Sequence, residues 1–404
     1  RNCAFSGNAA TYGGGMHNGN SNPTVINCAF SRNSAIYYNG GGMYNLNSSP
    51  TVAASIFNRN SAKFGGGMFS TSASSPTVIR CTFVMNTARN SGGGMYNKGG
   101  TPIVKECTYS ENAATYGGGM FNDASSPTVT TCLFTGNMAR EDLFQEKGGA
   151  MYNSGSNSIV TSCLFSGNSG YNGGAVYNSG GTSIVNNCTF SANTAFSGGA
   201  MYNASSSSTV TNSVLWGDSP QEIVNASSAP TIGFSNVLGG LPIGSVDEGG
   251  NLRLNPAFIR WPNPGPDGTW DGVDDDYGDL RLRGESPCID KGDPKFVAQS
   301  GETDIDGHAR VLCGKVDMGA YEFGIGDYDC DQVVDLADFS SWQVCMIGPH
   351  DVRELALAAL TAPAVQSAID NRQLAIGCEP FDFDGDGDVD LRDFAGFQRV
   401  FAGQ

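Results

Sequence analysis

The chain has 404 residues, of which 56 are glycine, 10% are aromatic and only 15% are charged. The aromatic content excludes a disordered chain, and the lack of any run of about 18 apolar residues argues against a transmembrane segment. Residues 1–216 carry a net charge of +4 (10 Lys and Arg, 6 Asp and Glu), whereas residues 217–404 carry −21 (12 and 33). This acidity disfavours nucleic acid as a partner, and clustered carboxylates instead indicate a hard cation.

An internal repeat occupies residues 1–216 and follows the pattern Thr/Ile-Val-x-x-Cys-x-Phe-x-x-Asn, with cysteine positions 25 to 31 residues apart. The valine column contains Val25, Val52, Val78, Val104, Val129, Val160, Val185 and Val210. The asparagine column contains Asn8, Asn33, Asn60, Asn86, Asn112, Asn137, Asn168 and Asn193. Such short units cannot each bury a core, so they must stack.

Each unit continues into Gly-Gly-Gly/Ala-Met-aromatic-Asn. Glycine and β-branched residues are poor helix formers, so we predict three strands per unit: Thr-Val to Phe, the small residue after Asn, and Gly-Gly-Met. In-register stacking would place Val, Cys, Phe, Ala and Met inside and align the asparagines in hydrogen-bonded ladders. The sequence therefore predicts an all-β, right-handed parallel β-helix with about 25 residues per coil. The insertion from Glu141 to Lys147 is expected to be a surface loop.

The paired motifs Gly-Gly-Ala/Gly-Met/Val and Phe-x-x-Asn resemble the repeats of chlamydial-type polymorphic outer-membrane proteins. Eight units cover roughly residues 1–216. The resemblance implies a surface-exposed β-helix with a role in adhesion. The chain departs from that family downstream, where no membrane β-barrel follows, so the resemblance does not imply autotransport.

Seven of the twelve cysteines occupy the repeat column, and none forms a Cys-x-x-Cys pair. A metal or redox site needs convergent ligands, so we expect a buried column of small, reduced side chains instead. The residue after each Met forms a second column, which begins at His17. Because strand side chains alternate, these aromatics should point outward if Met points inward. They would then form an exposed binding stripe, a stripe that only shields the sheet backbone, or one covered by a neighbouring segment. The predicted stripe contains Tyr44, Phe69, Tyr96, Phe121, Tyr152, Tyr177 and Tyr202.

Residues 217–326 break the repeat and are acidic. Their phrases Thr-Asp-Ile-Asp-Gly (303–307) and Val-Asp-Met-Gly-Ala-Tyr-Glu (316–322) resemble the segment that ends many secreted bacterial β-helix proteins. We expect this region to complete and cap the last coils, because an open solenoid end exposes unpaired edges. The stretch Asp267–Asp279 is either a further calcium site or a solvated acidic loop.

Residues 327–404 contain two loops with oxygen ligands at positions 1, 3, 5, 7, 9 and 12, the spacing by which EF-hands bind calcium. The predicted ligands of two Ca²⁺ ions are Asp327, Asp329, Asp331, Val333, Asp335, Asp338, Asp382, Asp384, Asp386, Asp388, Asp390 and Asp393. Asp at position 12 and an apolar helix start after each loop resemble type I dockerin modules, which implies a small helical domain and a cohesin-like receptor. Gln332 departs from the usual turn glycine, and Cys345 and Cys378 could be joined in an oxidising compartment.

Catalytic signals are weak. The acids of the repeat region occupy different columns, and Lys105 and Glu106 are expected on opposite faces of one strand. We therefore expect a non-catalytic structural or adhesive protein, extracellular or on the cell surface, that self-associates or binds a protein partner. A carbohydrate-active enzyme (polysaccharide lyase or hydrolase) and a glycan-binding module, both with polysaccharide as ligand, are the alternatives.

Overall fold

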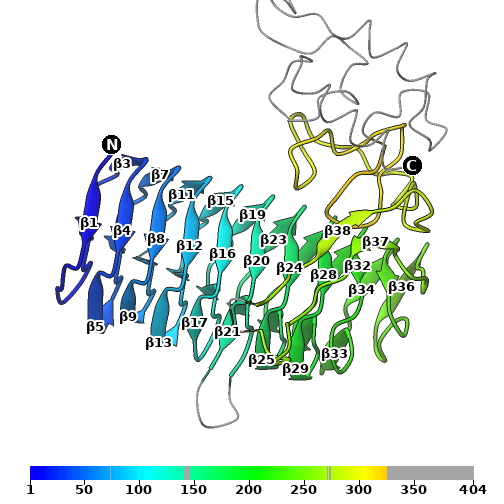
Figure 1. The fold of residues 1–404 in the computed structure, drawn as a ribbon, viewed down its shortest axis with the longest axis horizontal. Coiled ribbons are helices and arrows are strands. Elements are labelled where there is room, and N and C mark those ends of the chain that lie inside the picture. Colours follow the sequence, from blue (N-terminus) through cyan, green and yellow to red (C-terminus); the bar gives the residue numbers. More distant parts are fainter. Residues whose placement is uncertain (73, 141–145, 271, 273, 325–404) are drawn as a thin grey trace, which may run out of the picture.

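The computed structural model describes residues 1–72, 74–140, 146–270, 272 and 274–324. These residues form one long solenoid of stacked coils built from strands, with no helix among them (Figure 1). Since no described residue is helical, this part of the chain has no helix that could cross a membrane. Four large parallel sheets run along the solenoid, which confirms the predicted parallel β-helix. The predicted helical domain at 327–404 lies outside the described residues, as do residues 141–145 of the predicted loop.

The four sheets are named A to D. Sheet A contains β1 (Ala4–Ser6), β4 (Ala29–Ser31), β8 (Ile56–Asn58), β12 (Thr82–Val84), β16 (Thr108–Ser110), β20 (Leu133–Thr135), β24 (Leu164–Ser166), β28 (Thr189–Ser191), β32 (Val214–Leu215) and β35 (Asn236–Val237). Sheet B contains β5 (Ser34–Asn39), β9 (Ser61–Phe64), β13 (Thr87–Ser91), β17 (Ala113–Ala114), β21 (Met138–Ala139), β25 (Ser169–Asn172) and β29 (Thr194–Ser197).

Sheet C contains β2 (Met16–Gly19), β6 (Met43–Leu46), β10 (Met68–Thr71), β14 (Met95–Lys98), β18 (Met120–Asp123), β22 (Met151–Ser154), β26 (Val176–Ser179), β30 (Met201–Ala204) and β33 (Ile223–Ala226). Sheet D contains β3 (Thr24–Ile26), β7 (Thr51–Ala53), β11 (Thr77–Ile79), β15 (Ile103–Lys105), β19 (Thr128–Thr130), β23 (Ile159–Thr161), β27 (Ile184–Asn186), β31 (Thr209–Thr211), β34 (Thr231–Gly233) and β36 (Val246–Gly249). A separate antiparallel pair joins β37 (Phe258–Arg260) and β38 (Asp279–Leu282).

The segment from Thr-Val to Phe, predicted as one strand, is two strands in two sheets. A corner separates β11 of sheet D from β12 of sheet A, where Arg80 has a φ of +53°. Ala54 (+45°) and Glu106 (+54°) make the same corner in the neighbouring coils. This left-handed conformation is uncommon for residues other than glycine and turns the chain sharply. A complete coil therefore has four strands, and the prediction of three was wrong.

Identical side chains stack inside the solenoid. Phe57 pairs with Phe83 in register, and their rings lie 4.7 Å apart and 5° from parallel. Met68 pairs with Met95 in the same way, and both are fully buried. Six of the seven repeat cysteines are buried and free of disulfides, as expected for small core side chains, whereas Cys3 in the first coil is free and exposed. The buried six are Cys28, Cys81, Cys107, Cys132, Cys163 and Cys188. The inward columns of the repeat are thus confirmed.

The asparagine column forms a continuous ladder. Asn86 donates from Nδ2 to Oδ1 of Asn112 (2.9 Å) and to the carbonyl of Phe57 (2.8 Å). Its own Oδ1 accepts from the backbone N–H of Asn60 (3.0 Å) and from the Asn60 side chain (2.9 Å). Each asparagine side chain thereby hydrogen-bonds backbone N–H and carbonyl groups of the turn, which would otherwise be buried without partners. A Cβ on Gly67 would lie 2.9 Å from the Phe83 ring, and the equivalent positions of later coils are Ala150, Ala175 and Ala200.

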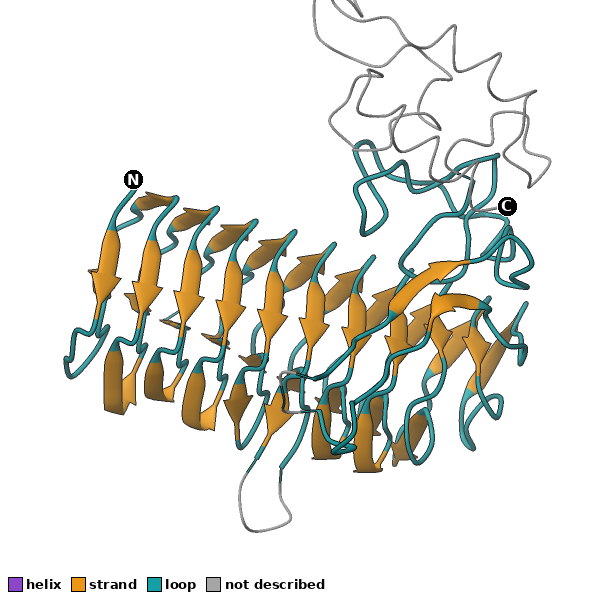
Figure 2. Ribbon diagram, viewed as in Figure 1, coloured by secondary structure: helices purple, strands orange, loops and turns teal. Residues whose placement is uncertain are grey.

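The coils continue past residue 216. Strands β33 to β36 extend sheets A, C and D, and Leu241 packs against the end of the core. Buried residues that follow these coils, including Phe258, Leu280 and Met318, form a second cluster with Leu164 and Val214 of sheet A (Figure 2). That residues 217–326 cap the last coils stays a prediction. The backbone N–H of Gly319 donates to the carbonyl of Asn212 (2.8 Å), and that of Ala320 donates to Thr189 Oγ1 (2.9 Å).

Replacing Asn86 by alanine should lower the free energy of unfolding by about 3 kcal/mol, because several buried partners lose their hydrogen bonds at once. Urea unfolding followed by circular dichroism measures the loss. The exposed Asn157→Ala, whose side chain bonds only at the surface, is the matched control. Equal losses for the two variants would contradict the structural role of the ladder.

Candidate functional site

The predicted aromatic stripe lies on the outer face of sheet C, with methionines inward as expected. Its exposure was predicted wrongly. Only 5–8% of the surface of five members is exposed, and Tyr152 and Tyr202 are partly buried. These five are Tyr44, Phe69, Tyr96, Phe121 and Tyr177.

Two contacts cover these rings. Neighbouring members stack in register, as Phe69 and Tyr96 do at 4.8 Å. Side chains from the preceding corner also pack on them, as Phe64 does on Tyr96 with ring centroids 5.6 Å apart. The stripe is therefore an outer satellite of the core, and it offers ring edges rather than ring faces.

Exposed aromatic side chains occur instead on sheet B. Tyr37 and Tyr38 on β5 are 75% and 47% exposed, and Phe196 on β29 is 69% exposed. Phe196 belongs to the terminal strand of the sheet, and its ring stacks on Tyr171 at 4.8 Å. The next coil continues beside it as a single bridge from Thr194 to Ser219. One sequence signal could have indicated this exposure. The repeat unit that contains Tyr37 and Tyr38 is two residues longer than a 25-residue unit, and the extra residues lie in β5, where the register shifts.

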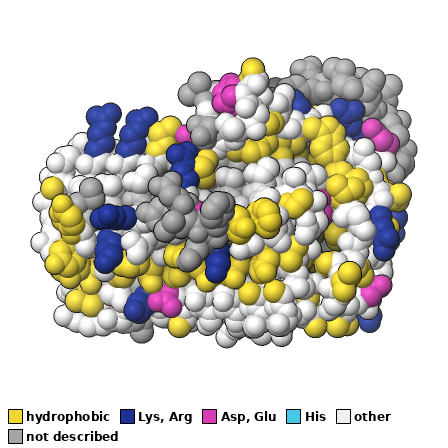
Figure 3. Space-filling model, turned by 90° about the horizontal axis from the view of Figure 1, so that it is seen from below, with side chains coloured by type: hydrophobic (Ala, Val, Ile, Leu, Met, Phe, Trp, Pro, Cys, Tyr) yellow, Lys and Arg dark blue, Asp and Glu magenta, His cyan; other side chains and the backbone are white. Residues whose placement is uncertain are grey.

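Two cations lie on the same face. Lys63 on β9 and Arg89 on β13 follow Ala62 and Ala88, which pair in register, and both side chains are exposed. Figure 3 shows hydrophobic side chains with Lys and Arg among them on the side where sheet B lies. We call Tyr37, Tyr38, Lys63, Arg89 and Phe196 the aromatic–basic face.

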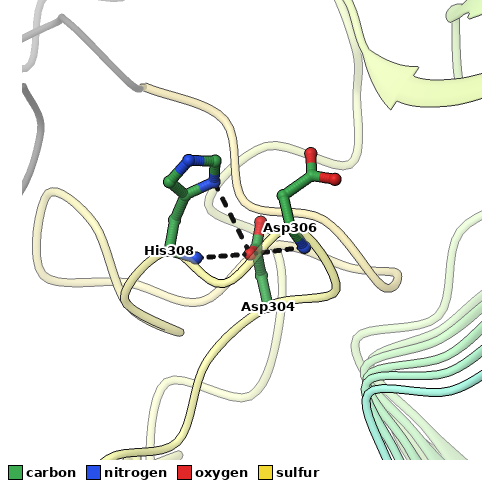
Figure 4. Close-up of side chains that lie close together, drawn as sticks. All are labelled: Asp304, Asp306 and His308. Atoms are coloured by element: carbon green, nitrogen blue, oxygen red, sulfur yellow. Dashed lines mark hydrogen bonds and ion pairs between the residues drawn. The ribbon is translucent and has the colours of Figure 1, made fainter. Parts of the chain in front are cut away.

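A second candidate is the group Asp304, Asp306 and His308, whose ligand atoms lie within 4.8 Å of one another (Figure 4). The Asp304 carboxylate already accepts the backbone N–H groups of Asp306 (2.9 Å), His308 (2.9 Å) and Glu322 (3.1 Å). Asp306 forms a two-pronged ion pair with Arg281, at 2.7 and 3.0 Å. These contacts give both carboxylates a structural role in the turn.

Buried Arg310 completes that structural role. Its Nη2 donates to the carbonyls of Asp317 (3.1 Å) and Gly319 (2.7 Å) and lies 3.2 Å from a carboxylate oxygen of Glu322. The motifs at residues 303–307 and 316–322 are therefore linked to each other by a hydrogen bond, and Arg310 adds an ion pair to the second motif. These contacts account for the fold of the segment that contains both motifs.

The acidic stretch Asp267–Asp279 is anchored by its aromatic residues. Trp270 is buried, stacks on Tyr277 at 5.6 Å, and lies so close that a Cβ on Gly167 would be 2.7 Å from its ring. This stretch brings Asp275 towards Glu111 of the coils. Burial, followed by the Asp275 charge, raises the pKa of Glu111, and burial also raises the pKa of Asp275. The predicted calcium site here remains a prediction, and Asp271 and Val273 lie outside the described residues.

Lys105 and Glu106 were expected on opposite faces of a strand, and this was wrong. Glu106 occupies the corner after β15, and its carboxylate pairs with Lys105 Nζ at 3.1 Å and with Arg80 Nε at 2.6 Å. The group is a surface ion-pair cluster. The twelve predicted tail ligands, from Asp327 to Asp393, all lie outside the described residues, as do Cys345 and Cys378.

A buried acid pair ends the asparagine ladder. Asp218 takes the next position in the column and accepts from the backbone N–H and side chain of Asn193, both at 2.7 Å. Glu222 accepts from the backbone N–H groups of Gly217 (3.0 Å) and Asp218 (3.2 Å). Burial, and then the charge of Asp218, raises the pKa of Glu222 to about 11, so the pair holds a proton at neutral pH. Sequence reasoning missed this pair because Asp218 lies beyond the last recognised repeat.

One family model supports the fold. A family model described as "Right handed beta helix region" matches residues 84–215. The crystal structure of pectate lyase Pel9A is similar at a TM-score of 0.37 and 15% sequence identity, over 73% of this chain and 69% of that chain. No curated protein sequence matches significantly. The family model assigns the right-handed β-helix and no activity.

The Glu222 proton should make the protein less stable as pH rises. Unfolded glutamate releases its proton near pH 4.3, whereas the folded state holds it towards pH 11, so stability falls between these values by at most about 1.4 kcal/mol per pH unit. Urea midpoints measured from pH 6 to 9 should fall less steeply for Glu222→Gln than for the parent chain. Glu248→Gln, at an exposed position, is the control. Parallel slopes for all three proteins would rule out the shared proton.

Proposed function

We propose that the chain is an extracellular, non-catalytic binding protein that presents the aromatic–basic face to an extended partner. The observation that carries this proposal is the exposure of Tyr37, Tyr38 and Phe196 on one sheet of a rigid solenoid. Exposed aromatic side chains cost solubility in a free protein and are typical of binding surfaces.

The stacked coils suit an extended partner better than a compact one. Sheet B has seven parallel strands, so side chains on β5 and β29 are separated by six strand spacings, about 29 Å in total. A ligand that contacts both ends must span that length. The backbone ladder fixes the spacing, so little ordering of the protein accompanies binding.

The tail supplies a second attachment in this proposal. Its two Asp-rich loops would each bind one Ca²⁺, and the ordered module would dock on a cohesin-like receptor. The sequence spacing of the carboxylates supports calcium, because closely packed acids repel unless a cation neutralises them.

A polysaccharide-cleaving enzyme is the second candidate. The approach of Asp275 to Glu111 favours it, because acids with raised pKa values can serve as general acids. Release of reducing ends or unsaturated products from any glycan, abolished in Glu111→Gln, would establish this function in place of the first.

The ring variants Tyr37→Ala and Phe196→Ala should each weaken binding to polysaccharide about tenfold, because each removes an exposed stacking surface. Binding of the full chain to immobilised glycans, measured by biolayer interferometry, gives the affinities. Ile103→Ala, a similarly exposed position on sheet D, is the control.

Two results would contradict the binding proposal. One is unchanged affinity in both ring variants. The other is a concentration-dependent dimer, seen by analytical ultracentrifugation, that Phe196→Ala dissolves, because the face would then bind a second copy.

The calcium assignment predicts two bound ions per chain. Isothermal titration of the chelator-treated protein should give that stoichiometry, and Asp327→Asn with Asp382→Asn should abolish it. Calcium at 100 times its dissociation constant should stabilise each site by about 2.7 kcal/mol. Asp247→Asn, exposed on β36, should leave the titration unchanged. Heat of binding that survives the double substitution would show that the calcium lies elsewhere.

A further inference from the structure

We propose that the ligand of the aromatic–basic face is an anionic polysaccharide, whose carboxylate or sulfate groups lie between Lys63 and Arg89. This inference rests on the proposed binding function and adds the chemical class of the ligand.

The cations are the first argument. Ala62 and Ala88 are paired across β9 and β13, and Lys63 and Arg89 follow them in these adjacent strands, whose backbones are about 4.8 Å apart, at the point where the register becomes irregular. Like charges in adjacent strands repel each other. Neither side chain forms an ion pair with any acid in the part of the chain that the structure describes. An anion placed between them would remove the repulsion and gain two charge-assisted contacts.

The surrounding rings are the second argument. Tyr37 and Tyr38 lie on β5, the strand next to β9, and Phe196 lies at the opposite end of sheet B. Each ring offers a flat apolar surface that suits the C–H face of a sugar. Rings beside cations fit a ligand whose units carry both an apolar face and a negative charge, as uronic acids and sulfated sugars do.

Charge distribution is the third argument. The coils of residues 1–216 are net positive, whereas residues 217–404 are strongly acidic. A polyanion would therefore bind along the coils and be repelled by the rest of the chain. The net charges thus favour the coils over the acidic remainder of the chain, and the cations on sheet B are Lys63 and Arg89.

The test compares three immobilised ligands: polygalacturonate for carboxylate, dextran sulfate for sulfate, and unmodified dextran as the neutral control. The full chain is used in calcium, with its affinity measured at 50 and 300 mM sodium chloride. We expect binding to at least one anionic polymer, about tenfold weaker binding in Lys63→Gln/Arg89→Gln, and a clear loss at the higher salt concentration. Lys295→Gln, an exposed cation away from sheet B, should bind as the parent chain does.

The outcomes separate the two proposals. Binding to dextran that needs Tyr37 and Phe196 but not the cations would overturn the anionic class and leave the binding function standing. Failure to bind all three polymers would count against both. Binding to single-stranded DNA as tight as that to the preferred polysaccharide would also overturn the assignment, because backbone charge alone would then explain the affinity.

Discussion

The molecule depends on one constraint, which is that each residue of a coil lies over its equivalent in the next coil. Backbone hydrogen bonds, ring stacking and the amide ladder all require the same register. Asn86 shows how strict the requirement is, because its side chain bonds to the coils on both sides at once. A slip of one residue would turn the Met and Phe columns outward and expose the core.

Most of the fold could be predicted because the same residue types recur at the same position of each repeat unit, and this recurrence gives the register of the strands. Val, Cys, Phe and Met recur at fixed positions, and only stacked strands place all four inside. The corner at Arg80 could not be predicted in this way. A positive φ is usually signalled by glycine, but here arginine adopts it, so the sequence carries no mark of the corner. The packing of the residues after 255 on sheet A could not be predicted either. Its contacts, such as Trp270 against Gly167, join segments about a hundred residues apart in the sequence.

The candidate site was harder to predict than the fold. Alternation along β14 places Tyr96 outward, but alternation does not reveal that Phe64 and the neighbouring rings cover it. Conversely, the exposed rings of Tyr37 and Phe196 lie on β5 and β29, which are the two end strands of sheet B. Exposure therefore depends on which side chains the neighbouring coils place beside each ring, and this information is absent from a single repeat unit.

The central claim is that the rigid stack displays a binding surface on sheet B. Hydroxyl-radical footprinting of the full chain, with and without the preferred polysaccharide, tests it most directly because aromatic side chains are labelled in proportion to their exposure. The account predicts reduced labelling of Tyr37, Tyr38 and Phe196 and unchanged labelling of Trp261, which is 41% exposed near β37. Protection of Trp261 with no change at the three sheet B rings would contradict it.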